Sequence, residues 1–274
     1  MTIVTAQFNG HGCKGYDELV RVFRDSVDEH MPEARYEELL MEAPDKVAGL
    51  GYAQTANTAK LKEWVKFLEQ CDDDVILADC DMLMLQSAAH AFDKDFDVAF
   101  TVRTHGHASI PVNNGIMMVR NTQAGKDFFR ILLEVNDRMY YEDAAFKHEW
   151  QAKYPGMNQA AFGYVYETGC HEAKMHAYQT VEWNAVDGDW PYITDKTVFL
   201  HLKGALRRQV LAMKPAGGPM AAAMRLWYEA SGRPELCESG LPYAGNKCRR
   251  MLLLQKKLIH KRDRSNHVST STVA

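Results

Sequence analysis

Short apolar runs alternate with amphipathic stretches along most of the chain. The apolar runs have the length and composition of strands that are buried in a sheet. The predicted strands span residues 2–8, 35–41, 74–79, 97–102, 115–119, 177–183 and 198–201. Between them, apolar residues recur at helical spacing, as Leu61, Trp64 and Leu68 do on one face of 57–70. The predicted helices span residues 16–30, 57–70, 122–134, 141–150, 157–166, 220–231 and 247–264.

This alternation predicts an α/β layer fold with a mostly parallel central sheet that is flanked by helices. The sequence KPAGGP at 214–219 is the best candidate for a linker, because Pro and Gly interrupt both helices and strands. We therefore expect a main domain over residues 1–213 and a helical appendage over 214–264. The polar segment 265–274, rich in Ser and Thr, is expected to be disordered.

Composition and charge limit the classes of partner. Hydrophobic residues make up 46% of the chain and charged residues 25%, as in ordinary globular proteins. The formal net charge is -4, so no overall positive field attracts nucleic acid, and no nucleic-acid partner is expected. A polyanionic ligand would need a local basic cluster or a metal ion. The six cysteines are scattered without a CxxC pair, which favours reduced thiols and a cytoplasmic location.

The sequence shows no membrane span, but its last predicted helix is strongly basic. No apolar run reaches the roughly 18 residues that a span needs, and the first residues lack the basic segment of a signal peptide. Residues 247–264 contain eight Lys/Arg and one acid, with an apolar stripe of Met251, Leu254 and Leu258. Two alternatives remain open for this segment. It either lies on an anionic membrane surface or packs on its own domain with a solvated basic face, which we favour.

The most informative motif is Asp79-Cys80-Asp81, which directly follows the apolar run VILA at 75–78. In open α/β sheets, ligands bind at the carboxyl ends of the strands. Two carboxylates placed there repel each other unless a cation neutralises them, and oxygen ligands favour Mg²⁺ or Mn²⁺. Such a cation can bind a diphosphate and stabilise it as a leaving group. Cys80 is expected to pack inward rather than to bind the metal.

The acid pair by itself is also compatible with a solvated strand end or with a phosphatase. Pairs of acids at solvated strand ends are common, and Asp72, Asp73 and Asp74 just upstream are interpreted in that way. Phosphatases with an aspartate nucleophile also place D-x-D after an apolar strand. In those enzymes the pair usually follows the first strand and precedes a small hydroxyl residue, whereas here Met82 and Leu83 follow it.

The wider sequence around the acid pair resembles a known family. Residues 59–83 carry a basic residue on a helix, then an apolar strand, then D-x-D. This order is similar to that of the retaining GT-A glycosyltransferases, which include glycogenin and bacterial lipooligosaccharide galactosyltransferases. Four downstream segments continue the resemblance within residues 1–210. They are NNG at 113–115, MNQ at 157–159, WN at 183–184 and HLKGALR at 201–207.

The resemblance implies a GT-A fold and assigns roles to individual residues. The implied ligands of Mn²⁺ (or Mg²⁺) are Asp79, Asp81 and His201, and both Asp79 and His201 end apolar runs, so the two are expected to meet at one sheet edge. The diphosphate would meet the basic residues and a glycine, namely Lys60, Lys203, Gly204 and Arg207. The nucleoside would border Thr5, Ala6 and Gln7. The donor sugar and its reacting carbon would contact Asn113, Asn114, Asn158 and Gln159, and Trp183 and Asn184 would lie near the acceptor.

Two residues depart from the family pattern. Asn158 stands where the family usually has Asp, which removes a carboxylate near the reaction centre. Arg207 stands where the family usually has Lys, which keeps the positive charge. The residues after Met213 have no clear counterpart in the family.

These observations together predict a metal-dependent glycosyltransferase that moves a hexose from a nucleotide-diphosphate sugar. The resemblance implies a UDP-sugar donor, such as UDP-glucose or UDP-galactose, and retention of configuration. The acceptor, whether glycan, lipid or protein, is not identified by the sequence. Two alternatives remain: a sugar-phosphate nucleotidyltransferase, which the glycine-rich stretch 9–15 only faintly resembles, and a binding domain without turnover, suggested by Asn158.

Overall fold

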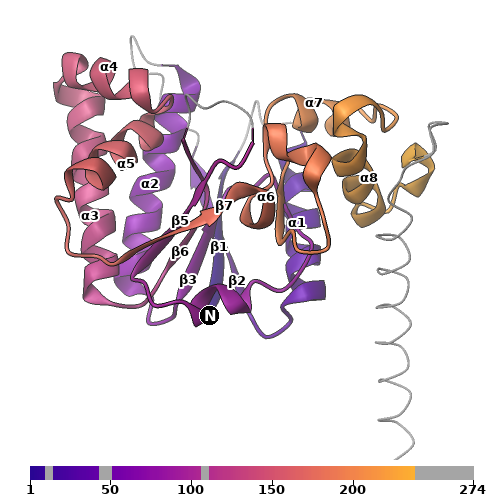
Figure 1. Ribbon diagram of the computed structural model, residues 1–274, viewed down its shortest axis with the longest axis horizontal. Coiled ribbons are helices and arrows are strands. Elements are labelled where there is room, and N and C mark those ends of the chain that lie inside the picture. The colour runs from indigo at the N-terminus through magenta and orange to yellow at the C-terminus, as the bar shows by residue number, and fades with distance from the viewer. Residues whose placement is uncertain (10–14, 43–50, 106–110, 238–274) are drawn as a thin grey trace, which may run out of the picture. The chain divides into compact units, whose positions relative to one another are not determined.

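A computed structural model describes residues 1–9, 15–42, 51–105 and 111–237. Its centre is a six-stranded sheet with the order β2-β1-β3-β6-β5-β7 (Figure 1). The strands are β1 (Thr2–Asn9), β2 (Arg35–Glu42), β3 (Val75–Ala78), β5 (Val98–Val102), β6 (Val112–Val119) and β7 (Met175–Gln179). Only β6 runs antiparallel to its two neighbours in this sheet, and the remaining pairs are parallel. The predicted α/β fold with a mostly parallel sheet is therefore confirmed.

Helices cover both faces of the sheet (Figure 1). One face packs against α2 (Tyr52–Gln70), α3 (Gln123–Asp137), α4 (Ala144–Lys153) and α5 (Met157–Thr168). The core on this side contains large fully buried side chains, among them Trp64, Phe100, Phe128, Phe129 and Phe162. The other face packs against α1 (Tyr16–His30), where Phe23 and Val27 are completely buried.

A second sheet of two strands begins directly after the acid pair in the sequence. Strand β4 (Met82–Met84) pairs antiparallel with β8 (Phe199–His201), so that Met82 lies opposite His201. Strand β4 was not predicted from the sequence, because three residues are too few to show an alternating pattern. This short pairing has a large consequence, since it carries His201 to the strand end where Asp79 and Asp81 lie.

Other predicted boundaries shift for identifiable reasons. Residues 177–183 were expected to be extended, but β7 ends at Gln179 and a helical turn, α6 (Thr180–Trp183), follows. The buried hydroxyl of Thr180 accepts a hydrogen bond from the backbone N–H of Thr104 at 3.0 Å, which holds the chain at this bend. The helix predicted over 141–150 is divided at Asp143: residues 141–142 end a π-helical turn, η2 (Arg138–Glu142), and α4 begins at Ala144, where the Asp143 side chain caps it by accepting from the N–H of Phe146.

Helix α3 is capped by Thr122, the first residue of the helix predicted over 122–134. The hydroxyl of Thr122 accepts a hydrogen bond from the N–H of Gly125 at 3.1 Å, which satisfies one of the free donors of the first helical turn. Helix α5 ends at Gly169, whose φ of 61° is the left-handed conformation that glycine adopts without strain.

The residues after 213 pack on the main body as far as they are described. Helix α7 (Ala205–Leu211) and helix α8 (Ala221–Ala230) share a third core cluster, in which Met224 and Trp227 are fully buried. Helix α8 agrees with the helix predicted at 220–231. The boundary at 213 stays a prediction, and the segments 247–264 and 265–274 lie outside the described residues. Among the helices that are described, none is long and apolar enough to cross a membrane.

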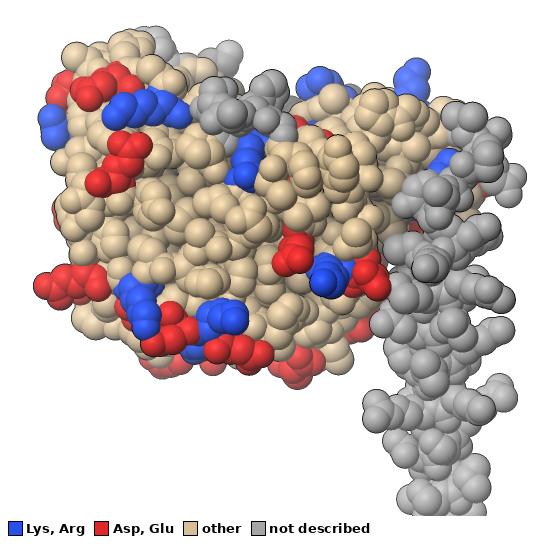
Figure 2. Space-filling model, viewed as in Figure 1, with Lys and Arg blue, Asp and Glu red and all other residues tan. Residues whose placement is uncertain are grey.

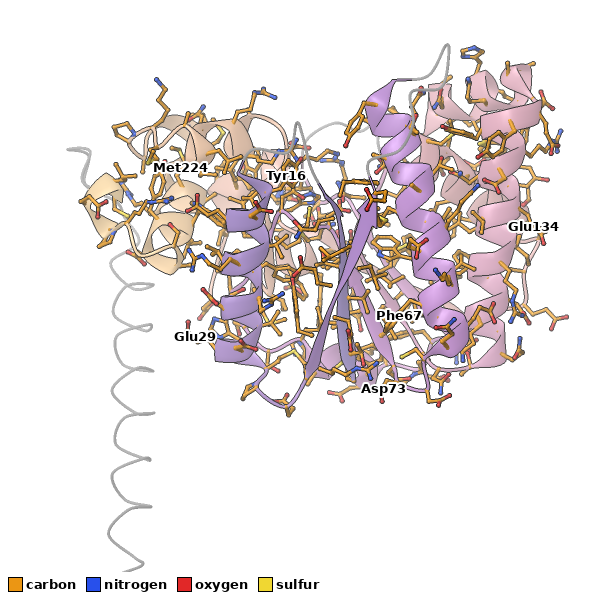
Figure 3. All side chains as sticks on the ribbon, turned by 180° about the vertical axis from the view of Figure 1, so that it is seen from behind. Tyr16, Glu29, Phe67, Asp73, Glu134 and Met224 are labelled. Carbon is orange, nitrogen blue, oxygen red and sulfur yellow. The ribbon has the colours of Figure 1, made fainter. Side chains whose placement is uncertain are left out.

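The amino ends of the parallel strands form an edge with many surface ion pairs. In the face shown in Figure 2, acidic and basic side chains are mixed along the lower edge of the molecule. Arg120 pairs with Asp74 at 3.2 Å and Lys174 pairs with Asp95, and all four residues flank strands at this edge. Figure 3 shows Asp73 at this edge, near the end of α1 that carries Glu29. Tyr16, at the other end of α1, lies toward the carboxyl ends of the parallel strands. The candidate site lies at that opposite, carboxyl edge.

Candidate functional site

A cavity of about 530 Å³ opens at the carboxyl edge of β1 and β3. This size is within the range of small-molecule and cofactor sites. Strand β1 contributes Ala6, Gln7 and Phe8 to its wall. The acid pair, strand β6, helices α2 and α3, the first turn of α5, Tyr16 at the start of α1, and the β8–α7 turn supply the remaining walls.

The structure brings the three predicted metal ligands together. The His201 Nε2 atom lies 3.6 Å from Asp79 Oδ2 and 3.4 Å from Asp81 Oδ1. One ligand atom from each of the three residues lies within 4.8 Å of the others. Asp81 and His201 are buried, at 4% and 2% exposure, while Asp79 is half-buried. Asp79 is held in place by its own N–H, which donates to the carbonyl oxygen of Gly115 at 2.8 Å.

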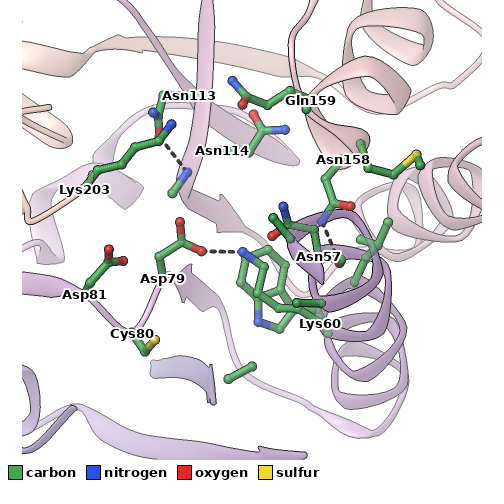
Figure 4. A pocket seen from close by; sticks show the side chains of 18 of the residues that line it. Asn57, Lys60, Asp79, Cys80, Asp81, Asn113, Asn114, Asn158, Gln159 and Lys203 are labelled. Atoms are coloured by element: carbon green, nitrogen blue, oxygen red, sulfur yellow. Dashed lines mark hydrogen bonds and ion pairs between the residues drawn. The ribbon is translucent and has the colours of Figure 1, made fainter. Parts of the chain in front are cut away.

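Each carboxylate of the acid pair uses its second oxygen for a basic side chain. The Lys60 Nζ atom pairs with Asp79 Oδ1, and the Arg207 Nη1 atom donates to Asp81 Oδ2 at 2.7 Å. The oxygens that remain, Asp79 Oδ2 and Asp81 Oδ1, are those that face His201. The contact between Lys60 and Asp79 is visible in Figure 4. The two basic residues thus orient the carboxylates so that one oxygen of each faces the imidazole.

These contacts change the protonation of the buried groups. Burial alone would raise the pKa of Asp81, but the neighbouring His201 and Arg207 outweigh it and hold that pKa well below its usual range. Burial opposes the charge of Arg207, yet Asp81 more than compensates and raises the pKa of the guanidinium. Burial, with the two adjacent carboxylates, raises the pKa of the Cys80 thiol well above its usual range. Cys80 points away from the two carboxylates, as Figure 4 shows.

A buried amide network fixes the ring of His201. The Nδ1 atom of His201 lies 3.1 Å from Asn184 Oδ1, and Asn184 Nδ2 donates to Asn113 Oδ1 and Thr101 Oγ1, both at 2.9 Å. The indole N–H of Trp190 donates to the His201 carbonyl oxygen at 3.3 Å. Because an amide oxygen can only accept, Nδ1 carries a proton, and Nε2 is the nitrogen left to coordinate a metal ion.

The imidazole of His201 lies directly on Gly115. A Cβ atom added at position 115 would lie 2.5 Å from His201 Cε1 and 2.6 Å from His201 Nδ1. Both distances are far below ordinary van der Waals contact. The glycine of the NNG segment is therefore required by the close approach of the histidine ring to strand β6.

Amide side chains line the opposite side of the cavity (Figure 4). The Gln159 Nε2 atom donates to the carbonyl oxygen of Val112 at 2.7 Å, and the Asn158 Nδ2 atom donates to that of Asn57 at 2.9 Å. The Oδ1 atoms of Asn114 and Asn158 are buried and have no hydrogen-bond partner among the described residues.

Most of the predicted ligand-contacting residues line the cavity. They are Ala6, Gln7, Lys60, Asp79, Asn113, Asn114, Asn158, Gln159, Lys203, Gly204 and Arg207. Within the described part of the chain, Lys203 makes no hydrogen bond or ion pair. Gly204 has a φ of 59°, which favours glycine, and a Cβ there would meet open space, so that its backbone is accessible.

Two sequence-based assignments need correction. Thr5 does not line the cavity: it is completely buried, and its hydroxyl donates to the Ala78 carbonyl oxygen at 3.1 Å. Asn184, which the resemblance placed near the acceptor, is also completely buried and holds His201 and Asn113. Its neighbour Trp183 is 4% exposed and packs on Tyr178, with ring centroids 4.5 Å apart.

Several cavity residues were not identified from the sequence. They include Phe8, Tyr16, Tyr52, Asn57, Trp64 and Gly156. The Arg207 Cζ atom lies over the Tyr16 ring, 5.1 Å from the ring centroid. The Lys60 Nζ atom lies over the Trp64 ring, 4.5 Å from its centroid. The sequence did offer a signal for the contact between Lys60 and Trp64, because residues four positions apart on a helix lie on the same face.

The family follows from a comparison of sequence profiles. The profile of the nucleotide-diphospho-sugar transferases matches residues 59–206, which is more than half of the chain. The chain belongs to this family. The matched range runs from the helix that carries Lys60, through the acid pair, to the residue before Arg207. No curated protein sequence matches the chain.

Solved structures with the same fold are glycosyltransferases of low sequence identity. Apo GlyE of Streptococcus pneumoniae TIGR4 aligns with a TM-score of 0.55 and 13% identity, over 84% of this chain and 59% of that one. A glycosyltransferase involved in the glycosylation of the major capsid of PBCV-1 aligns with a TM-score of 0.50 and 11% identity, over 76% and 96%. An active-site mutant of LgtC aligns with a TM-score of 0.50 and 15% identity, over 85% and 95%.

These comparisons confirm the GT-A fold and the enzyme class. The chain is a glycosyltransferase of the nucleotide-diphospho-sugar family, and the resemblance inferred from the motifs is confirmed at that level. At these identities the solved structures establish the fold, while donor and acceptor must be argued from the residues of this chain.

Proposed function

We propose that this enzyme is a metal-dependent hexosyltransferase that uses a UDP-sugar and transfers the sugar to a glycan, lipid or protein acceptor. The observation that carries the proposal is the convergence of Asp79, Asp81 and His201 at the edge of a cavity of nucleotide-sugar size. Membership of the nucleotide-diphospho-sugar transferase family supports the nature of the donor.

The three side chains fit a hard divalent cation. Two carboxylate oxygens and one imidazole nitrogen are suitable ligands for Mn²⁺ or Mg²⁺, and the set lacks a thiolate because Cys80 points away. The Asn184 contact on Nδ1 keeps Nε2 available. When bound, a divalent ion would neutralise the two phosphates and stabilise the diphosphate as the leaving group.

The basic residues of the cavity complete the neutralisation of charge. Lys203 is free of partners among the described residues and lies in the cavity wall, so it is available to a phosphate oxygen. Arg207 and Lys60 hold the metal-binding carboxylates and add their charges to the same space. Because the chain is acidic overall, this local cluster supplies the positive charge that a diphosphate requires.

The remaining walls divide between nucleoside and sugar. Ala6, Gln7 and Phe8 at the end of β1 would border the nucleoside, and Tyr16 and Tyr52 offer aromatic faces beside it. Asn114, Asn158 and Gln159 would contact the sugar, and Gln159 is fixed by its bond to the backbone of β6. Asn113 would contact the sugar through Nδ2, because its Oδ1 atom already accepts from Gly115 N and Asn184 Nδ2.

Retention of configuration is proposed from the resemblance to the retaining GT-A enzymes. Asn158 supplies an amide where that family usually has a carboxylate. We therefore do not assign a nucleophilic carboxylate to this position. The product anomer, read by proton NMR, tests this point directly.

Calorimetric titration of UDP into the protein, with and without Mn²⁺, tests the proposal. We expect binding that requires the metal and that is lost in Asp81→Asn. Metal-dependent release of UDP from a UDP-sugar, with sugar transfer on an acceptor array, tests turnover. Binding of UTP with sugar-1-phosphate and release of pyrophosphate would instead indicate a nucleotidyltransferase. Metal-independent or absent binding of UDP would contradict the proposal.

A further inference from the structure

A cluster of charged and aromatic side chains lies outside the cavity, where the chain leaves β5. It joins Arg103 and His105, which follow β5, to Asp187, Asp189 and Tyr192 of the short helix η3 (Asp187–Tyr192). The Arg103 guanidinium pairs with Asp187 at 3.0 Å, and the His105 Nδ1 atom lies 3.0 Å from Asp189 Oδ1. The rings of His105 and Tyr192 are stacked, with centroids 4.1 Å apart and an angle of 19° between their planes. We call these five residues the η3 cluster.

The η3 cluster adjoins the donor site at two points. The backbone N–H of Arg103 donates to the Pro111 carbonyl oxygen at 2.9 Å, directly before β6, the strand that carries Asn113 of the cavity wall. Helix η3 also carries Trp190, whose indole N–H donates to the His201 carbonyl oxygen at 3.3 Å. Strand β5 lies next to β6 and runs parallel to β7, so the cluster lies at the carboxyl edge of the sheet, one strand beyond the residues that would contact the donor sugar. A molecule bound there would lie beside that sugar.

The polar groups of the η3 cluster are held in fixed positions. Asp189 is completely buried and accepts from the backbone N–H of His105 at 3.2 Å, in addition to its contact with the ring. Because a carboxylate can only accept, His105 Nδ1 carries a proton, and Nε2 of the neutral ring is left to accept from a hydroxyl. The Arg103 side chain is 4% exposed and pairs with Asp187, whose side chain is 34% exposed. A buried guanidinium thus holds a carboxylate at the surface.

A sugar ring matches the exposed side of the η3 cluster. Tyr192 is 54% exposed although His105 covers one face of its ring, which leaves an accessible aromatic surface. The C–H groups of a pyranose pack on such a surface, while its hydroxyls need fixed polar partners such as the Asp187 carboxylate and His105 Nε2. A lipid chain would instead need a wide apolar surface, and the exposed tyrosine here lies among charged side chains.

We infer that the acceptor is a glycan, and that one of its sugar rings packs on Tyr192 and donates hydroxyl hydrogen bonds to Asp187 and His105. This inference rests on the proposed function, since it names the acceptor of the same transfer. It also moves the acceptor along the chain. Trp183 and Asn184 are buried, whereas the η3 turn that follows them reaches the surface beside the donor site.

Saturation-transfer NMR on the protein saturated with UDP and Mg²⁺ tests the inference. The probes are maltose, lactose and cellobiose, together with the methyl glycosides of glucose, galactose, mannose and N-acetylglucosamine. We expect at least one probe to receive saturation mainly on its ring C–H protons, and its affinity to fall about fivefold or more in Tyr192→Ala. Binding of none of these saccharides, or unchanged affinity in Tyr192→Ala, would overturn the inference.

Calorimetry of UDP with the metal separates the two levels of the account. If UDP binds and no saccharide does, the inference fails and the proposed function stands. If UDP does not bind, the proposed function itself fails, and the inference fails with it.

Three further variants locate the saccharide on the η3 cluster. Tyr192→Phe keeps the ring and should retain the saccharide signal that Tyr192→Ala loses. Asp187→Asn should weaken binding, because an amide oxygen is a weaker acceptor for a hydroxyl than a carboxylate. Tyr141→Ala is the matched control, because Tyr141 is 62% exposed and lies outside both the η3 cluster and the cavity wall. A loss in Tyr192→Phe or Tyr141→Ala as large as that in Tyr192→Ala, at native melting temperature, would overturn the assignment of Tyr192.

Discussion

The Nδ1 atom of His201 lies 3.1 Å from the Oδ1 atom of Asn184, in a completely buried amide network. This contact determines which nitrogen of the imidazole is presented to Asp79 and Asp81. It joins the metal-ligand residues to Asn113 and Thr101 in the central sheet, so the site is supported by the core rather than by a loop. Support of this kind is typical of metal-ligating histidines.

Asn184→Ala should weaken the metal site without removing any ligand. Without the Asn184 carbonyl oxygen, the His201 ring loses the acceptor that fixes its tautomer. The affinity for Mn²⁺ in the presence of UDP is expected to fall about 10-fold to 100-fold. Electron paramagnetic resonance titration of free Mn²⁺ measures this change. Unchanged affinity in a variant of native melting temperature would show that the network does not position the ligand.

Gly115→Ala should displace the imidazole of His201. The added methyl group would lie 2.5 Å from His201 Cε1, and neither the ring nor the strand can move without breaking the contact to Asn184. We expect metal-dependent UDP binding to fall at least about tenfold. Gly217→Ala is the control, because a Cβ there comes no closer than 3.9 Å to the Pro215 oxygen. Calorimetry that finds normal binding in Gly115→Ala would contradict the described packing.

Arg207→Met should affect both stability and the donor site. Arg207 holds Asp81, which is 4% exposed, so its removal leaves a buried carboxylate with one partner fewer. We expect a loss of about 1–3 kcal/mol in the free energy of unfolding without metal, measured by urea denaturation. Added Mn²⁺ with UDP should restore part of this loss, since the ion neutralises the same carboxylate. Arg208→Met, an exposed neighbour outside the cavity wall, should be close to neutral.

The stability of the metal-free protein should decrease in acid through Asp81. Its pKa is held below the usual value by His201 and Arg207, which outweigh the opposing effect of burial. A depressed pKa stabilises the fold above the pKa of the unfolded chain, about 3.9, and this contribution is lost as the pH falls below that value. Between pH 5 and pH 3 the free energy of unfolding should therefore fall less steeply in Asp81→Asn than in the unsubstituted protein. Parallel pH curves would contradict the described ion pairs.

The layer architecture could be predicted from the sequence because buried strands and amphipathic helices alternate clearly. Strand β4 and the first turns of α2 could not. A strand of three residues has no measurable period, and the residues from Tyr52 to Asn57 contain too few apolar side chains to define a helical face. The helical turn at Thr180 could not be predicted either, because its sequence TVEW favours a strand. The hydrogen bond from the Thr104 N–H to the Thr180 hydroxyl, which holds this turn, joins residues far apart in the sequence.

The candidate metal ligands could be predicted as a set from the family resemblance, which agrees with the positions of Asp79 and His201 at the ends of apolar runs. The inner partners of the site could not. Thr5 was placed in the cavity wall, but in a strand buried on both faces the sequence does not show which side a residue takes. The resemblance placed Asn184 near the acceptor, and nothing in the sequence indicates that its side chain points into the core.

The central claim is that Asp79, Asp81 and His201 bind one divalent ion together with a nucleotide diphosphate. Crystals grown with Mn²⁺ and UDP, measured at a wavelength where manganese scatters anomalously, test it most directly. We expect a single strong anomalous peak at coordination distance from Asp79 Oδ2, Asp81 Oδ1 and His201 Nε2, with the diphosphate oxygens completing its shell. A bound diphosphate without that peak, or a manganese ion held elsewhere in the cavity, would contradict the claim.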